Sequence, residues 1–401
     1  MVVFNPYDPV TWRDPYPIYA RLRAEEPVHR NEELGFWAFA RHADVLAAHN
    51  DWDTYSSTGG VTIEGAERGA PMLILKDPPE HRWHRKIIGR VFTPRRIMAL
   101  EPFIRARAGE LLDRHRDVGE FDVVGEFAIK LPLDVISELL GIPAERRSTV
   151  SELSDRLAAR GPDTDPTAAM EAGAGLLTLY LELVAERRRN PQDDIISMIM
   201  NTEVIDDEDG RTRSMSDEEI AFRFLELGFA GHETVAKGIP NGLMALTRFP
   251  DQARLLRDDL SLAGKAVEET LRFDPPSQLQ GRITTREVVV QGVTIPAGER
   301  VMLITGSALR DESVYERPDT YDLRRTEHPS TLFFGFGIHR CLGAHLARLE
   351  MKIAFEEIFQ RYEEFHVDVD RAVHHVSTNV RGVSHLPLVV DRAGTPATAG
   401  V

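Results

Sequence analysis

The sequence predicts a mainly α-helical protein with a small β part, and three observations support this fold class. Residues 81–260 carry helical patterning almost throughout, with only short breaks. Apolar side chains recur at helical spacing after Cys341, at Leu342, Leu346, Leu349 and Ile353. The clearest β pattern is confined to residues 286–303, with turns expected at Gln291-Gly292 and Ala297-Gly298.

The N-terminal region predicts short regular elements followed by a long loop. Residues 36–40, "FWAFA", favour a strand, and residues 42–49, "HADVLAAH", favour a helix. Residues 54–80 are punctuated by Gly and Pro and predict a long loop. Loops of that length inside a compact chain are usually functional, so we expect this one to have a role in function.

The helical region has breaks near residues 92–94, 141–143, 160–166, 190–194 and 206–210. Ser216 and Glu219 form an S-x-x-E capping box, which predicts a long helix from about Asp217 into the 240s. Pro240 lies inside this helix, so we expect the helix to end or kink there.

Composition and charge exclude several functional classes. A formal net charge of −16 over 401 residues argues against nucleic acid or anionic lipid as the main partner, because both attract basic surfaces. One cysteine cannot build a disulfide framework, and a free thiol suits a reducing compartment. The N-terminus lacks a signal-peptide pattern, and no apolar run approaches the roughly 20 residues that span a bilayer. We therefore expect a soluble cytoplasmic protein with no membrane insertion.

The single cysteine lies in a glycine-rich stretch, "FGFGIHRCLG". Gly335 and Gly337 allow the backbone to approach a ligand closely or to take positive φ. Cys341 stands at the start of the predicted helix, where the helix dipole favours a thiolate. One Cys cannot build a zinc or iron–sulfur site, but haem needs only one axial protein ligand, and Cys thiolate is a recognised one. The alternative is a glycine-rich turn that precedes a core helix.

This stretch resembles the haem-binding loop of the cytochrome P450 superfamily, whose pattern is F-G-x-G-x-H-x-C-x-G. Every fixed position matches, at Phe334, Gly335, Gly337, His339, Cys341 and Gly343. The N-terminal "DPYPIYARLR" and the C-terminal "NVRGVSHLPL" also look like soluble bacterial members, so the resemblance covers essentially the whole chain. It implies one cytochrome P450 domain over residues 1–401. Haem b would lie between the long distal helix and the helix after the cysteine loop, with Cys341 as axial ligand.

A second motif, "AGHET" (230–234), lies in the long helix. Its small residues leave room for a flat group on one helix face, and Thr234 can hydrogen-bond back to the carbonyl four residues earlier. Taken alone, the motif is typical of a helix packing contact with a solvated Glu. By resemblance, Glu233 and Thr234 are the acid–alcohol pair that delivers protons in catalysis, and Ala230 contacts the haem.

A third motif, "EETLR" (268–272), places Glu269 and Arg272 three residues apart on a helix, where they can pair. Taken alone, such a pair is a surface salt bridge of little worth. The resemblance implies instead a structural pair that supports the haem face. The family often adds a third, Arg partner from the following meander, where this sequence has Thr320. The possible substitutes are Arg317, Arg324 and Arg325.

Haem carries two propionates, for which Arg and His are natural donors. By resemblance we assign this role to His81, Arg85, Arg282 and His339. The alternative for His81 is a solvated helix face, and for His84 this is the interpretation that we adopt.

The resemblance implies a haem-thiolate monooxygenase that inserts one oxygen atom of O2 into a C–H bond of a small or medium apolar molecule. A polyketide, terpenoid, steroid or fatty acid would fit. Electrons would come from NAD(P)H through a ferredoxin or flavodoxin with its reductase, docking near Arg340, Arg348 and the arginines of 82–96. The alternatives are ring coupling, desaturation or peroxide-driven oxidation by a haem-thiolate enzyme, and a non-catalytic haem carrier or gas sensor.

The substrate pocket is expected to be mostly apolar, with Ile74, Leu227 and Leu279 in its lining. Glu226 lies near the same helix stripe as Thr234 and could hold a substrate amine or hydroxyl if it faced the pocket. The interpretation that we favour is a salt bridge between Glu226 and Arg223 or a nearby cation.

Overall fold

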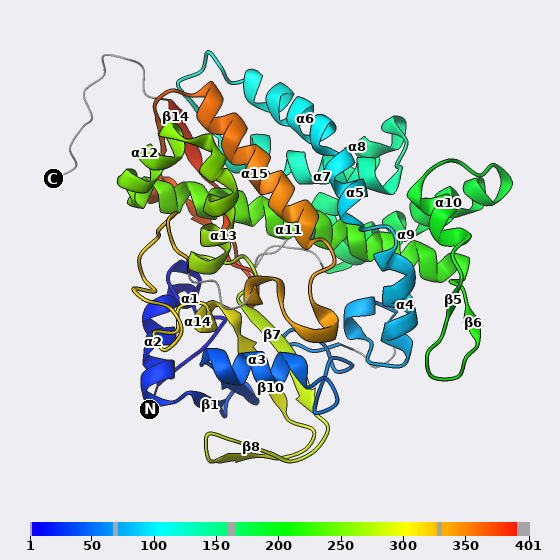
Figure 1. Cartoon of the computed structure of the whole chain (residues 1–401), viewed down its shortest axis with the longest axis horizontal. Helices are drawn as coiled ribbons and strands as arrows, with labels where there is room; N and C mark the ends of the chain where they lie inside the picture. The colour runs from blue at the N-terminus through cyan, green and yellow to red at the C-terminus, as the bar shows by residue number, and fades with distance from the viewer. Residues whose placement is uncertain (1, 67–70, 159–165, 327–330, 391–401) are drawn as a thin grey trace.

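The computed structural model describes residues 2–66, 71–158, 166–326 and 331–390. Figure 1 shows a helix-rich part around the long helix α11 (Asp217–Arg248) and a smaller strand-rich part, against which the N-terminal helices lie. The prediction of a mainly α-helical fold with a small β part is therefore confirmed.

The α-helices of the described residues agree with most of the predicted breaks. The breaks near 92–94, 141–143 and 190–194 fall between helices, the one near 206–210 falls in a short hairpin, and the one at 160–166 lies almost wholly outside the described residues. The helices are α1 (Pro9–Arg13), α2 (Tyr16–Glu25), α3 (His42–Asn50), α4 (Glu80–Gly89), α5 (Pro94–Ala99), α6 (Glu101–Asp113), α7 (Lys130–Leu140), α8 (Ala144–Ala158), α9 (Pro166–Arg189), α10 (Ile195–Met200), α11, α12 (Pro250–Asp258), α13 (Ala263–Phe273), α14 (Thr305–Ala308) and α15 (Ala344–Arg361).

Short helical segments connect several of these elements. One is a π-helical turn, and the others are 3-10 turns. They are η1 (Leu73–Leu75), the π turn η2 (Val124–Ala128), η3 (Leu260–Leu262), η4 (Leu332–Phe334), η5 (Gly337–His339) and η6 (Val369–Arg371). Within the described part of the predicted loop 54–80, the structure has a two-residue strand, η1 and, at residue 80, the start of α4, while residues 67–70 lie outside the described part.

The largest sheet has the strand order β1-β2-β10-β7-β3 and joins residues 28–56 to residues 279–304. Its strands are β1 (Val28–Asn31), β2 (Phe36–Phe39), β10 (Arg300–Ile304), β7 (Leu279–Thr284) and β3 (Tyr55–Ser56). Strand β10 runs parallel to β2 and antiparallel to β7, so that Met302 is paired with both Ala38 and Gly281. A second sheet has the order β11-β14-β4, from β11 (Phe365–Val367), β14 (Pro387–Val390) and β4 (Glu120–Asp122).

Three two-stranded ladders complete the β part that the structure describes: β5 (Val204–Ile205) with β6 (Thr212–Arg213), β8 (Val288–Val290) with β9 (Val293–Ile295), and β12 (Val373–His374) with β13 (Val383–His385). The turn between β8 and β9 has positive φ at both Gln291 and Gly292, as a two-residue type I′ hairpin turn requires. The predicted turn at Gly298 also has positive φ.

Helix α11 is the centre of the helical part and packs against α7, α9, α13 and α15. Its capping box is confirmed: Glu219 N donates to Ser216 Oγ at 3.2 Å, and Ser216 N donates to Glu219 Oε2 at 2.8 Å. A side chain at Gly231 would place its Cβ 2.9 Å from Ile136 Cγ1 of α7. The glycine is therefore what allows α7 and α11 to cross so closely.

Pro240 does not end α11, so that alternative of the prediction is wrong. The helix continues to Arg248. Every residue from Val235 to Leu246 is buried, so the tertiary packing of this stretch outweighs the loss of one backbone donor at the proline.

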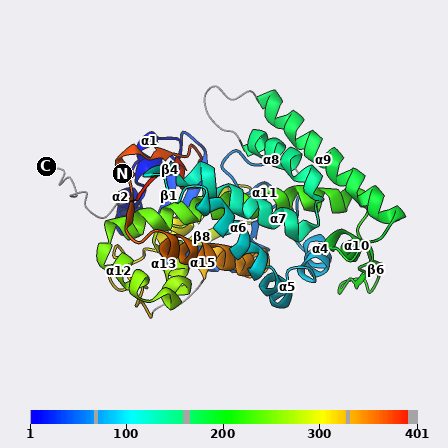
Figure 2. The ribbon, with the colours of Figure 1, turned by 90° about the horizontal axis from the view of Figure 1, so that it is seen from above.

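Helix α9 meets the length and composition of a membrane span, contrary to the expectation that no segment would. Its apolar window has a mean hydropathy of 1.4, and 33% of that window is buried. Figure 2 shows α9 on the outside of the helical part, beside α8, and it also contacts α11. Because helices packed on soluble cores meet the same criterion, this one helix does not indicate a membrane protein.

Candidate active site

A cavity of about 310 Å³ lies between α11 and the segment that leads into α15, within the size range of small-molecule sites. Its walls come from seven parts of the chain: the end of α3, residues 73–92, Ile136 of α7, α11, residues 271–282, Thr305 of α14 and residues 332–351. Figure 1 shows α11 and α15 crossing above the orange loop that precedes α15. The cavity therefore brings together segments that are far apart in the sequence.

The glycine-rich loop positions Cys341 on the cavity wall. Gly335 and Gly337 both have a φ of +68°, which confirms the prediction that these glycines take left-handed backbone. A Cβ on Gly337 would lie 2.4 Å from the carbonyl oxygen of His49, so the loop also packs directly on the end of α3. Cys341 N donates to Phe334 O at 2.7 Å, which closes the loop. Phe334, Gly335 and Gly343 line the cavity with Cys341.

The electrostatics of the thiol differ from the prediction. Helix α15 begins at Ala344, so Cys341 lies in the turn before it rather than in its first turn. Burial among protein atoms raises the pKa of the Cys341 thiol. This effect exceeds those of a backbone hydrogen bond from Gly343 and of the charge of Arg85, which lower the pKa. Cys341 has exposed surface, but it lines the interior cavity. The protein alone therefore favours the thiol, and a metal ion would be needed to stabilise the thiolate.

Three buried imidazoles line the cavity, and one of them, His339, belongs to the cysteine loop itself. His81 and His49 have no hydrogen-bond partner at either ring nitrogen among the described residues, and His339 has none at Nε2. His339 Nε2 lies 3.8 Å from Asp77, beyond hydrogen-bond distance, and the His81 and His339 rings lie 4.5 Å apart. The prediction named His81 and His339 but missed His49, which no motif marks.

Two arginines face the same imidazoles. Arg282 on β7 is 3% exposed, and its Nη1 donates to Gly281 O at 2.6 Å. Arg85 on α4 donates from Nη2 to Arg340 O at 2.5 Å, which ties α4 to the cysteine loop. Burial, with the charges of Arg282 and His339, lowers the pKa of His49 to about 3. Burial lowers the pKa of Arg282 to about 10. Such a cluster of donors is costly to bury without an anion to receive them.

Helix α11 forms another wall of the cavity through one stripe of residues, which includes Leu227, Ala230, Gly231 and Thr234. Thr234 has no hydrogen-bond partner in the described part of the chain, so the expected bond to the carbonyl of Ala230 is not formed. Glu233 does not line the cavity. Its Oε1 lies 3.8 Å from His375 Nε2, and its side chain is 18% exposed, so the acid lies between the cavity wall and the solvent.

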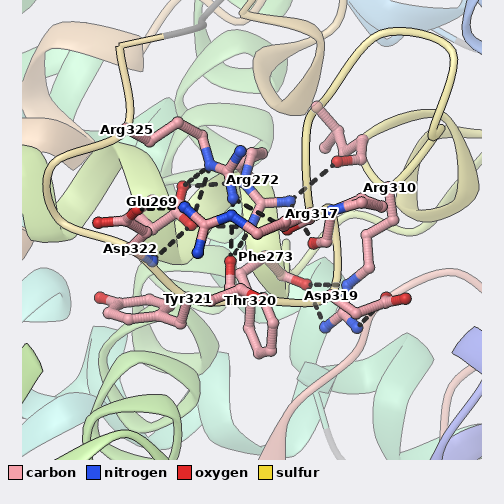
Figure 3. Close-up of polar contacts among 12 residues, drawn as sticks. Glu269, Arg272, Phe273, Arg310, Arg317, Asp319, Thr320, Tyr321, Asp322 and Arg325 are labelled. Carbon is pink, nitrogen blue, oxygen red and sulfur yellow. Dashed lines mark hydrogen bonds and ion pairs between the residues drawn. The ribbon is translucent and has the colours of Figure 1, made fainter. Parts of the chain in front are cut away.

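The Glu269–Arg272 pair is buried rather than a surface salt bridge, and Figure 3 shows its surroundings. Arg272 donates to both carboxylate oxygens of Glu269 at 2.8 Å. Of the three candidate substitutes for the third partner, Arg325 is the one at Glu269, with its Nε 3.2 Å from Oε2. Arg317 instead pairs with Asp322, and Arg324 is exposed.

Two residues of the predicted set lie elsewhere. Leu279 does not line the cavity, because side chains alternate along β7. Leu279 packs under the sheet with Met302 and Ile304, whereas Gln280 and Arg282 face the cavity. His84 is not solvated but fully buried, with Nδ1 2.9 Å from Glu80 O and Nε2 3.1 Å from Glu219 Oε1.

Glu226 and Ile74 do line the cavity, and they contact each other. Glu226 accepts from the backbone N–H groups of Leu73 and Ile74 and pairs with Arg223 at 2.6 Å. The favoured salt bridge with Arg223 is therefore confirmed, and the carboxylate is already in use.

These features match one kind of cofactor. A flat metal-containing group that takes one thiolate ligand would be held by Cys341, and carboxylates on its edge would meet the ring nitrogens of His49, His81 and His339. The site thus defines a haem-thiolate type of protein by the chemistry of its donors.

Comparison with known proteins gives the family. The cytochrome P450 family model matches residues 166–384. Vitamin D(3) 25-hydroxylase of Pseudonocardia autotrophica is 42% identical over 390 residues, which cover 94% of each chain. Putative cytochrome P450 123 of Mycobacterium tuberculosis is 39% identical over 397 residues, 97% of each chain. The structure of cytochrome P450 CYP109Q5 from Chondromyces apiculatus superposes with a TM-score of 0.89 at 33% identity, covering 98% of this chain and 100% of that one.

The chain belongs to the cytochrome P450 family, whose members are monooxygenases. The predicted fold, enzyme class and family are therefore confirmed.

Proposed function

We propose that this P450 inserts one oxygen atom of O2 into a C–H bond of a small or medium apolar molecule. The observation that carries the proposal is the cavity itself, because Cys341 and the mainly apolar stripe of α11 that includes Thr234 line the same cavity. The 42% identity to a protein named vitamin D(3) 25-hydroxylase supports a steroid-sized apolar substrate. The main apolar core cluster takes residues from Val28 to Leu388, which supports treating residues 1–401 as one domain.

Haem b would be held by the Cys341 thiolate and by donors to its propionates. The donor set is His81, Arg85, Arg282 and His339, to which the structure adds His49, because all five line the cavity. Phe334, Gly335, Gly343 and Ala230 line the cavity and would lie against the ring, whereas Gly337, also predicted to contact the haem, is not part of the cavity lining and packs on the end of α3. When bound, haem with a thiolate ligand supplies the activation and cleavage of O2.

The chain's own part in the reaction is to deliver protons and exclude water. Thr234 presents to the cavity a hydroxyl that has no partner among the described residues, and it would donate a proton to the reacting oxygen. Glu233 is partly exposed and would take protons from the solvent side. Neighbouring residues on a helix point about 100° apart, so a water or a rotation of the Glu233 side chain must carry the proton to Thr234.

Electrons from NAD(P)H would arrive through a ferredoxin or flavodoxin and its reductase in the cytoplasm. The face beside Cys341 carries Arg340, which is exposed, as are several arginines of 82–96. Arg348 is less available, because it forms an ion pair with Glu268 at 2.5 Å. We therefore expect charge reversal at Arg340 to slow reduction of the protein more than reversal at Arg348.

The ferrous carbon monoxide difference spectrum tests the cofactor and its ligand. We expect the strongly red-shifted Soret band of thiolate ligation in the wild type and its loss in Cys341→Ser. A histidine-type band in the wild type would refute the assignment of Cys341. Substrate-dependent NADH consumption with a surrogate ferredoxin system and product analysis then separate a monooxygenase from a haem carrier or gas sensor, which would show no turnover.

A further inference from the structure

One polar cluster in the cavity wall is not used by the chemistry proposed above. Glu226 Oε2 accepts from Leu73 N at 2.9 Å, and Oε1 accepts from Ile74 N at 3.0 Å. Arg223 Nη1 donates to Oε2 at 2.6 Å. The side chains of Glu226 and Arg223 are 14% and 2% exposed. We call these contacts among Glu226, Arg223 and the amides of Leu73 and Ile74 the Glu226 clasp.

The Glu226 clasp joins two walls of the cavity that are otherwise separate in the chain. Leu73 and Ile74 begin the 3-10 turn η1, whose first N–H groups have no acceptor inside the turn. A carboxylate from α11, more than 150 residues away, supplies both acceptors. Hydrogen bonds to a charged group are roughly twice as strong as neutral ones, so the contact is strong for its size.

The charges around the clasp favour its present pairing. Burial lowers the pKa of the Arg223 guanidinium, whereas Glu226, Glu219 and Glu80 raise it. Glu219 is itself held by the capping box and by His84 of α4. Helix α11 therefore binds α4 through Glu219. It binds residues 73 and 74, which precede α4 in the chain, through Glu226, and Arg223 pairs with Glu226.

The clasp also limits which further groups the Glu226 carboxylate can bind. Its two oxygens already receive three donors, so a substrate amine could bind there only by displacing Leu73, Ile74 or Arg223. Because the Leu73 and Ile74 side chains line the cavity, their position sets the width of the cavity beside the α11 stripe.

We infer that Glu226 is a positioning residue that fixes residues 73–75 as a wall of the cavity, and that it thereby determines which ligands fit. The inference rests on the proposed function, in that this cavity takes the substrate above the haem. On this inference, Glu226 contributes to ligand specificity through the position of residues 73–75 and without contacting the reacting atoms.

The experiment compares holoprotein of the wild type, Glu226→Gln and the control Glu218→Gln. Glu218 lies in the first turn of α11 and is exposed. Hydrogen exchange is followed at the amides of Leu73 and Ile74. Loss of a charged acceptor costs about 1.5–3 kcal/mol, so we expect exchange about tenfold faster or more in Glu226→Gln. The control should match the wild type.

The second readout is the ratio of the dissociation constants of 4-phenylimidazole and imidazole, two haem ligands of different bulk, measured by spectral titration. We expect this ratio to change by about threefold or more in Glu226→Gln, with haem content unchanged. If Glu226→Gln does not fold, Glu226→Asp keeps the charge opposite Arg223 but shortens the reach to the two amides, and the same results are expected.

Unchanged exchange at Leu73 and Ile74 would overturn the clasp. Faster exchange with an unchanged ligand ratio would overturn its role in specificity. A wild type without a thiolate-type carbon monoxide spectrum would refute the proposed function instead, and the exchange result would still stand as a test of the clasp.

Discussion

The third partner of the Glu269–Arg272 pair can be tested with an unusually close control, because two arginines stand side by side in the chain. Arg325 is 8% exposed and reaches Glu269, whereas its neighbour Arg324 is exposed. Arg325 also donates to the carbonyl oxygens of Glu316 at 2.7 Å, Arg317 at 3.1 Å and Thr320 at 3.0 Å. One guanidinium therefore holds together the segment that passes beneath Glu269 (Figure 3).

We predict that Arg325→Gln destabilises the protein by about 3 kcal/mol. Breaking a buried ion pair costs about 3–5 kcal/mol, and the lower value applies because Arg272 still balances the charge of Glu269. With an unfolding entropy of about 2.1 cal/mol/K per residue, a chain of this length should lose about 4 °C in Tm. Arg324→Gln should leave the Tm within about 1 °C, as an exposed substitution does.

The assay is thermal unfolding of the two holoproteins, followed by circular dichroism and by the Soret band. Equal shifts in the two variants would refute the reasoning, since it depends on the buried contact rather than on the loss of one positive charge. A shift in the Soret transition alone would place the effect on haem retention and not on the fold.

The remaining predictions concern the cavity. Thr234→Ala should uncouple turnover, so that NADH consumption continues while peroxide replaces product; full coupling would refute the proton-delivery role. Leu279→Ala should cost about 2–5 kcal/mol in the free energy of unfolding, because the side chain is 1% exposed, yet leave ligand titrations unchanged. Ile74→Ala should change ligand affinity, because Ile74 lines the cavity, and should change the free energy of unfolding little. His49→Phe should release haem faster to apomyoglobin than the wild type does, because it removes an imidazole whose ring nitrogens have no partner among the described residues; equal release rates would exclude His49 from the propionate set.

Much of the fold and part of the site follow from local patterns in the sequence. The capping box at Ser216 and the turn at Gln291-Gly292 are local, so their signals are complete within a few residues. The glycines of the cysteine loop are also local, because positive φ is a property of a single residue.

Other features depend on contacts that no local pattern contains. Arg317, Arg324 and Arg325 have the same chemistry, and only the path of the chain selects which of them reaches Glu269. Leu279 was predicted to line the cavity but packs on the other face of the sheet. Both faces of this mixed sheet are buried, so an apolar residue of β7 can point to the cavity or away from it. His49 lies in a helix without any motif, and its place in the cavity wall follows only from where α3 ends.

The contact between Gly337 and His49 has a consequence for the order of synthesis. A ribosome releases α3 and α4 early, but the loop that completes their side of the cavity comes near the end, as the 255 residues between Arg85 and Arg340 illustrate. Domains fold as their segments emerge, so the early imidazoles have no finished site to join until almost the whole chain has left the ribosome. Nascent chains stalled before residue 332 should therefore fail to retain haem, however well their first helices have formed.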